Sequence, residues 1–190
     1  MARSRSRGSA LSRRSALLAP AALALAATDA SSAAAEAPAL TLEDRLALQG
    51  LLGDLLWALD CNDEDGFIGL FTPDLEVYGL GRLYDAEATV RAWFRGLISL
   101  RDEAGEAWLH EAGQFRFEGD GRVCVVYAYA THFRVNPQTR DMGVRSLGYF
   151  VNECVHAEGG WRFRRFSINR WDNERQPWRK PKPWEAIVGE

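Results

Sequence analysis

The first regular pattern in the chain is a series of leucines, spaced mainly three and four residues apart, over residues 42–59. This spacing puts them on one side of a helix, and Thr41 before two acidic residues is a typical helix start. A second, short helix is predicted over residues 62–71, because its first two residues, Asn and Asp, can accept hydrogen bonds from free N–H groups. The sequence therefore predicts two successive helices with Asp60 at their junction.

Further along the chain the spacing of apolar residues changes from helical to alternating. A third helix is predicted over residues 85–99, with Asp85 as its N-terminal cap. Strands are predicted over residues 75–78, 107–117, 122–135, 144–156 and 161–172. The last segment, residues 173–190, is rich in Pro and Trp and is not predicted to be helical. Three helices followed by long antiparallel strands indicate an α+β fold whose sheet buries one face under the helices.

Two of the three histidines fall on one predicted hairpin. A turn around residues 119–121 would pair residues whose numbers sum to about 240, which sets His110 opposite Ala130 and His132 opposite Trp108. Side chains two apart on a strand share a face, so the two histidines would be diagonal neighbours. They share that face with small residues, namely Ala112, Cys124, Ala128 and Ala130.

The opposite face of the same hairpin carries large apolar side chains: Leu109, Phe115, Phe117, Val123, Val125, Tyr127, Tyr129 and Phe133. In one interpretation this bulky face is the core, which leaves both histidines in solvent. In the other, the face of small residues lies under the helices and encloses a cavity with the histidines. The bulky face would then join subunits into a homodimer or homotrimer. The pattern leaves both interpretations open.

The start of the chain resembles an export signal. Residues 1–14 are rich in arginine, residues 17–27 are apolar, and Ala33 and Ala35 form a possible cleavage site, so residues 1–35 are expected to be removed on maturation. The paired Arg13 and Arg14 resemble the twin-arginine signal of bacteria. An ordinary secretory signal and a disordered tail are the alternatives. We expect a periplasmic or extracellular protein.

The charge of the chain limits its possible partners, and the spacing of its cysteines indicates their role. The chain has a net charge of −3, and loss of residues 1–35 leaves 18 basic and 25 acidic residues. This acidic balance argues against nucleic acid and against an anionic membrane surface as partners. Cys61, Cys124 and Cys154 form no C-x-x-C motif and are expected to be buried small apolar residues.

The helix junction also carries a family resemblance. Its segment reads Trp-Ala-Leu-Asp-x-x-Asp-x-x-x-Phe-x-x-Leu-Phe-Thr-Pro-Asp over residues 57–74. With the order of elements over residues 40–172, it resembles the SnoaL-like group of the nuclear transport factor two-like superfamily, which includes polyketide cyclase-like proteins. The resemblance implies a cone-shaped α+β barrel (cystatin-like), with three N-terminal helices packed on a curved, mainly antiparallel sheet.

Within that group the chain is similar to scytalone dehydratase and related enzymes, which implies catalytic roles for Asp60, His110 and His132. Asp60 is expected to hydrogen-bond His132, the base, while His110 assists. Residues expected to bind the substrate are Tyr78, Trp57, Trp93, Phe150 and Asn169. The implied protein is a cofactor-free lyase or isomerase acting on a small apolar carbonyl compound. Alternatives are a non-catalytic binding domain and a metal site at Asp60, His110 and His132.

Overall fold

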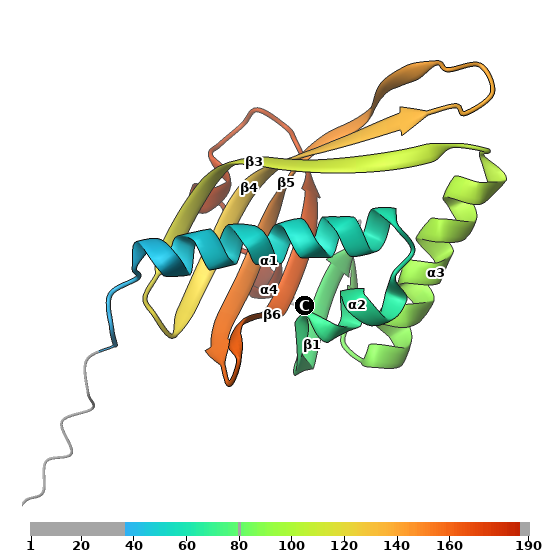
Figure 1. Cartoon of the computed structure of the whole chain (residues 1–190). Helices are drawn as coiled ribbons and strands as arrows, with labels where there is room; N and C mark the ends of the chain where they lie inside the picture. Colours follow the sequence, from blue (N-terminus) through green and yellow to red (C-terminus); the bar gives the residue numbers. More distant parts are fainter. Residues whose placement is uncertain (1–36, 80, 187–190) are drawn as a thin grey trace, which may run out of the picture. The chain divides into compact units, whose positions relative to one another are not determined.

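Six strands and three main helices make up the part of the chain that the computed structural model describes, residues 37–79 and 81–186 (Figure 1). The predicted export signal over residues 1–35 lies outside this part. Within the described residues, no helix is long and apolar enough to cross a membrane.

The elements follow the predicted order, except that a short strand, β2, was not predicted. The helices are α1 (Leu42–Asp60), α2 (Glu64–Gly69) and α3 (Glu87–Glu103). The strands are β1 (Phe71–Gly79), β2 (Arg82–Tyr84), β3 (Ala107–Gly119), β4 (Val123–Val135), β5 (Met142–Ala157) and β6 (Gly160–Arg170). They form one open sheet in the order β2-β1-β6-β5-β4-β3, antiparallel except for the β1–β6 pair. The predicted α+β class is confirmed, with a curved sheet that does not close.

Local sequence signals set the ends of the first two helices. The Thr41 side chain accepts a hydrogen bond from the third helical N–H of α1, as a capping residue does. Helix α1 ends at Asp60. Two residues later Asn62 has a left-handed backbone, with a φ of 63°, through which the helix cannot continue. Asp63 then caps α2 by accepting from the N–H of Gly66 at 2.8 Å.

The third helix and the tail differ from the prediction. Asp85 does not cap α3: the helix starts at Glu87, and the hydroxyl of Thr89 bonds both the N–H and the carbonyl of Ala86 instead. The helix also extends four residues past Ser99. The C-terminal segment, predicted to lack helix, contains a short 3-10 helix, η1 (Pro177–Arg179), and a four-residue helix, α4 (Pro183–Ala186).

The register of the β3–β4 hairpin is shifted from the predicted one. The Asp120 carboxylate accepts from the N–H groups of Arg122 and Val123, at 2.7 and 3.0 Å, and this turn pairs Gly119 with Cys124. The predicted sum of about 240 was therefore wrong, because the turn is centred one to two residues later.

A bulge in β3 changes the pairing again. The register shifts between Gly113 and Arg116, where Gln114 has a φ of 53°. Beyond this bulge His110 pairs directly with His132 rather than with Ala130. A bulge also reverses which face successive side chains occupy. Phe115 and Phe117 therefore pack on the core side with the small residues, not on the opposite face as predicted.

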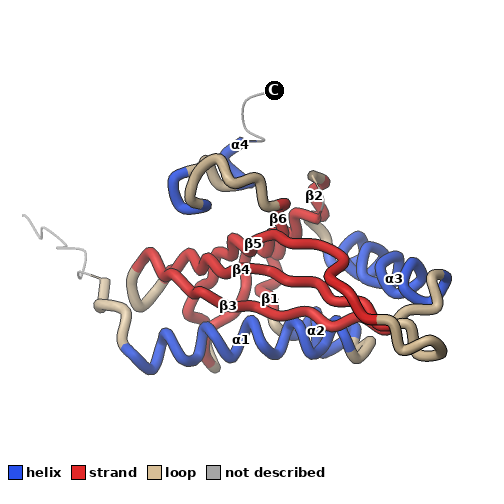
Figure 2. Tube along the Cα trace, turned by 90° about the horizontal axis from the view of Figure 1, so that it is seen from above, coloured by secondary structure: helices blue, strands red, loops and turns tan. Residues whose placement is uncertain are grey.

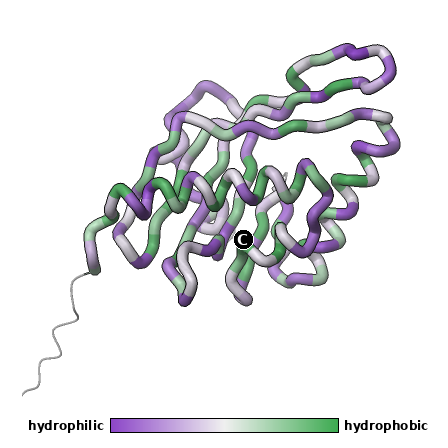
Figure 3. Tube along the Cα trace, viewed as in Figure 1, coloured by the Kyte–Doolittle hydropathy of each residue, from purple (hydrophilic) through white to green (hydrophobic). Residues whose placement is uncertain are grey.

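The face of small residues forms the core, as the second interpretation proposed. Cys124, Val126, Ala128 and Ala130 of β4 are at most 6% exposed and pack in one cluster with the leucines of α1. In Figure 3 hydrophobic positions recur along α1, whereas the tip of the β4–β5 hairpin is hydrophilic. Small residues suit this position because their short side chains allow α1 to lie close to the sheet.

The opposite face of the sheet is partly covered by the chain's own C-terminal segment. Figure 2 shows this segment on the side of the sheet away from α1. Trp171 and Trp184 pack there against Tyr127, Tyr149 and Val151, each of which is at most 8% exposed. The tail thus shields part of the face that was expected to join subunits.

The three cysteines divide into two environments. Cys124 and Cys154 are fully buried, as expected, and burial raises the pKa of both thiols. Cys61 is exposed, against expectation, because α1 has ended before it and its side chain no longer faces the sheet.

Candidate functional site

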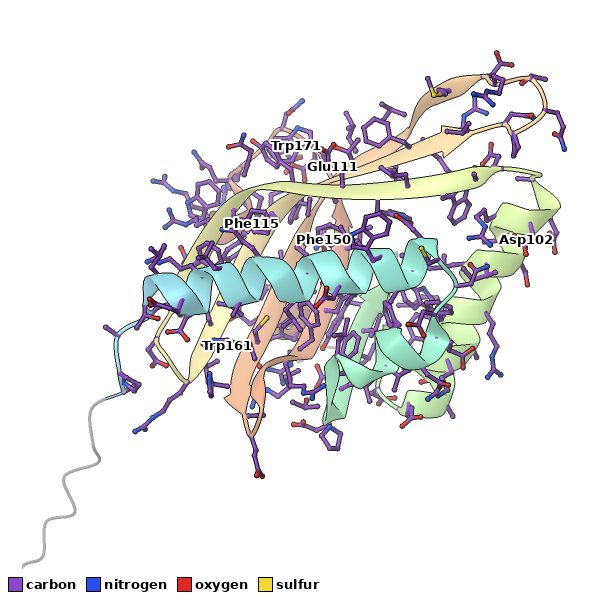
Figure 4. The ribbon with its side chains drawn as sticks, in the orientation of Figure 1. Asp102, Glu111, Phe115, Phe150, Trp161 and Trp171 are labelled. Carbon is purple, nitrogen blue, oxygen red and sulfur yellow. The ribbon has the colours of Figure 1, made fainter. Side chains whose placement is uncertain are left out.

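A cavity of about 290 Å³ lies between helices α1 and α3 and strands β3–β6. Its walls are mainly apolar and include Leu56, Leu59, Leu97, Phe150, Phe166 and Ile168. Figure 4 shows Phe150 between the sheet and α1. The volume is near the lower end of the roughly 300–1,000 Å³ typical of small-molecule sites, so the cavity suits a ligand of one or two rings.

The end of α1 brings Asp60 to His110 on β3. Asp60 Oδ1 lies 2.6 Å from His110 Nδ1, and Asp60 Oδ2 accepts from the backbone N–H of His110 at 2.8 Å. The two side chains are 13% and 9% exposed. A carboxylate can only accept hydrogen bonds, so Nδ1 carries the proton and Nε2 of His110 keeps its lone pair.

A carboxylate at the C-terminal end of a helix faces the negative end of the helix dipole, which disfavours it. The guanidinium of Arg101, only 9% exposed, offsets this by donating to the Asp60 carbonyl at 3.4 Å. Capping does not explain an acid at this end of α1, whereas its two bonds to His110 give it a specific role.

His132 is held between two rings. Its imidazole stacks on that of His110, with centroids 4.3 Å apart, and contacts the edge of Trp108 at 4.6 Å. Its Nε2 is buried without a hydrogen-bond partner in the described structure. Burial is the main cause that lowers the pKa of His132 to about 4, and the neighbouring His110 and Arg145 act in the same direction. This histidine is therefore neutral at pH 7.

The expected pairing of Asp60 with His132 was wrong: the carboxylate binds His110. The predicted register made the histidines diagonal neighbours, whereas the bulge in β3 sets them directly opposite each other. Strand β3 is the edge strand that packs on α1, so the acid reaches the histidine on β3 first.

Three of the five residues predicted to bind substrate line the cavity: Trp93, Phe150 and Asn169. The Asn169 amide is already engaged, since it donates to Ser167 Oγ at 3.0 Å and lies 3.5 Å from the Tyr149 carbonyl oxygen.

The other two lie elsewhere. Trp57 is 70% exposed, because Leu56 and Leu59, three residues apart on α1, face the core and leave Trp57 on the outer side of the helix. Tyr78 points to the outer side of β1, since Val77 before it is in the core. Its hydroxyl donates to Glu76 at 2.6 Å, and its ring lies 6.1 Å from that of Trp184.

The sequence interpretation missed a charged cluster beside the histidines. Glu106 accepts from Arg145 at 2.6 Å, from Arg134 at 3.2 Å and from the indole of Trp108 at 3.0 Å. The Arg145 guanidinium lies 4.9 Å from the Trp108 ring centre and belongs to the cavity wall. Glu106 directly precedes β3, and the residues that contact it come from β3, β4 and β5, so no sequence spacing joins them.

The alternative of a metal site at Asp60, His110 and His132 has no geometric counterpart in this part of the chain. Among the described residues, no group of three or more His, Cys, Asp or Glu side chains has the arrangement of a metal site.

The fold and site define a cystatin-like α+β protein with a ligand-sized cavity. The chain belongs to the SnoaL-like domain family, whose model matches residues 40–167. No curated protein matches the sequence significantly.

Solved structures of this fold include Aln2 from a Streptomyces species, with 20% identity, a TM-score of 0.63, and coverage of 70% of this chain and 94% of that one. An ntf2-like protein with a cystatin-like fold from Novosphingobium aromaticivorans has 17% identity, a TM-score of 0.61, and coverage of 78% and 90%. A candidate scytalone dehydratase from the same organism has 16% identity, a TM-score of 0.56, and coverage of 74% and 97%. At these identities the likeness shows the fold alone.

Proposed function

We propose that this protein is a cofactor-free lyase or isomerase, of dehydratase type, acting on a small and mostly apolar carbonyl compound. The observation that carries the proposal is the Asp60–His110 pair beside an apolar cavity, next to a second, neutral histidine. Membership in the SnoaL-like family and the likeness in fold to a candidate dehydratase support the reaction class.

In this mechanism His110 is the base. Its Nε2 lone pair takes a proton from the carbon next to the substrate carbonyl, and Asp60 stabilises the imidazolium that forms. The electron pair of the broken C–H bond moves into the enolate. His132 is neutral and can donate a hydrogen bond to the developing enolate oxygen.

The proton is then returned from His110. In a lyase it goes to a hydroxyl on the neighbouring carbon, which leaves as water while the C=C bond forms. In an isomerase it goes to a different carbon of the same skeleton. Both outcomes balance without a redox partner.

The test is exchange of substrate protons for deuterium. The protein is incubated in D2O with cyclic ketones that fit the cavity, such as 2-tetralone and 1-indanone, and deuterium at the carbon next to the carbonyl is followed by NMR. We expect exchange above the buffer rate, lost in His110→Gln. The second candidate is a non-catalytic binding domain, which the apolar enclosure favours. Binding of these ketones without any protein-dependent exchange would support it.

We further propose export and self-association. The arginine-rich start and apolar stretch of residues 1–35 support a twin-arginine route to the periplasm or exterior, which fractionation of the native host tests. Leu109, Tyr129 and Leu147 remain 47–60% exposed and would join two or three copies. A monomer by solution mass measurement would contradict that assembly.

A further inference from the structure

Two charged side chains line the cavity, and each carries a positive charge. Of the lining residues, and apart from the histidines, only Arg145 and Arg170 carry a charge at neutral pH. Within the described part of the chain, no carboxylate belongs to this wall. Polar groups in an otherwise apolar site fix the orientation and identity of a ligand.

Arg145 owes its place to an irregularity in β5. His132 pairs with Ser146 and Phe133 with Val144, so Arg145 is an extra residue between two paired ones. A bulge of this kind redirects a side chain and is common beside active sites. Here it brings the guanidinium over the ring of Trp108, which in turn contacts His132.

The guanidinium of Arg145 is held in place by an ion pair, but not all of its N–H donors are used. Glu106, whose side chain is 10% exposed, bonds Nη1 of Arg145 at 2.6 Å. The same carboxylate also pairs with Arg134, so two cations share one anion and the cluster keeps one net positive charge. Guanidinium has five N–H donors, and within the described residues Glu106 is the only acid that Arg145 contacts.

We propose that Arg145 is a specificity-determining residue that binds a carboxylate of the substrate, so that the substrate class is a small cyclic carbonyl compound bearing one carboxylate. This inference rests on the proposed function in taking the same cavity as the substrate site. The planar fork of the guanidinium suits a carboxylate, which it can bind through two parallel hydrogen bonds. The ring of the ligand would then contact the apolar wall formed by Phe150, Phe166 and Ile168.

The experiment compares two probes with the same ring system, 2-naphthoate, which carries a carboxylate, and 2-naphthamide, which carries a neutral amide of similar size. Binding is measured by calorimetry and by quenching of tryptophan fluorescence, since Trp93 and Trp108 line the cavity. We expect the acid to bind roughly 10- to 100-fold more tightly than the amide. The preference should vanish in Arg145→Gln and partly persist in Arg145→Lys, which keeps the charge but not the fork.

Arg116 provides a matched control, because it also lies over a tryptophan, Trp178, at 4.6 Å and pairs with Glu118 at 2.7 Å. It is on the outer side of the sheet, so Arg116→Gln should keep the preference for naphthoate. Thermal unfolding of each variant establishes that it is folded. Equal binding of acid and amide by the wild type, or an unchanged preference in folded Arg145→Gln, would overturn the assignment.

The probes have no exchangeable proton next to a ketone and are not turned over. Failure of the proposed catalysis, seen as absence of deuterium exchange, is therefore measured separately from failure of carboxylate recognition. A protein that prefers naphthoate through Arg145 but exchanges no ketone proton would retain this inference as a property of a binding domain.

Discussion

Replacement of Asp60 by asparagine tests the role of the carboxylate with little change of shape. Asp60 accepts two hydrogen bonds from His110, one from the ring at 2.6 Å and one from the backbone at 2.8 Å. An asparagine has an acceptor at its carbonyl oxygen and only donors at its NH2 group. If its oxygen keeps the backbone N–H, its NH2 faces the ring, and Nδ1 must then offer a lone pair. The ring proton moves to Nε2, which can no longer act as a base.

The size of the effect follows from these contacts. Both hydrogen bonds survive as neutral ones, so we expect Asp60→Asn to lose about 1–2 kcal/mol of unfolding free energy, the difference between charged and neutral bonds. Catalysis of ketone exchange should fall about 10²- to 10⁴-fold, as when a neutral group fixes the wrong tautomer of a catalytic histidine. Asp60→Ala leaves the buried donors unpaired and should cost about 1–3 kcal/mol more.

The assay is nitrogen-15 NMR of histidine-labelled protein, in which the sequence offers only three histidines to assign. The wild type should show the proton of His110 on Nδ1, and Asp60→Asn should show it on Nε2. Urea unfolding measures the stability change on the same samples. A wild-type tautomer together with wild-type exchange in Asp60→Asn would refute the reasoning.

Three further predictions follow from burial and close contacts. His132 has a folded pKa of about 4 against 6.5 when unfolded. The unfolded state therefore binds more protons between these values, and stability should fall as pH drops from 6.5 to 4. The largest possible loss of unfolding free energy is about 3 kcal/mol, and solvent access reduces it to about 1–2 kcal/mol. Urea unfolding at several pH values measures this loss, which should be smaller in His132→Gln. A β-carbon in Gly79→Ala would lie 2.6 Å from the Trp93 indole nitrogen, so this variant should lose roughly 1–3 kcal/mol of unfolding free energy. Its melting temperature and its affinity for naphthoate should both fall. The control is Gly50→Ala, whose β-carbon meets nothing within 4 Å and which should not destabilise the protein. Cys61 should be the single thiol that reacts rapidly with Ellman's reagent in the native protein, and rapid reaction of all three would contradict the described burial.

The sequence predicted those parts of the fold that depend on neighbouring residues. The cap at Thr41 and the leucine series of α1 are local, and both were read correctly. The start of α3 was missed because Thr89, inside the helix, satisfies the Ala86 backbone and leaves Asp85 without a capping role. A nearby side chain with the same chemistry competed with the expected one.

The candidate site was predictable in its residue types but not in its contacts. The two histidines share a face as predicted, but this depends on the register: the pairing set by the turn alone would place His110 opposite Phe133, and the bulge in β3 brings His110 and His132 onto one face. Their exact pairing depended on a turn stabilised by Asp120 and a bulge at Gln114, and neither has a fixed sequence signature. Tyr78 was placed in the pocket by family resemblance, although the alternation of β1 directs it outward.

The two bulges that sequence reasoning missed account for much of the chemistry of the site. Without the bulge in β3, His110 would be displaced along the strand from His132 and the stacked pair would be lost. Without the bulge in β5, Arg145 would not be the additional residue over Trp108. Each bulge interrupts ladder hydrogen bonds, so it costs stability that regular strands would retain. These two irregular positions occur on strands that line the cavity, where they bring His110 and Arg145 to it, so the stability that they cost is offset by the site that they form.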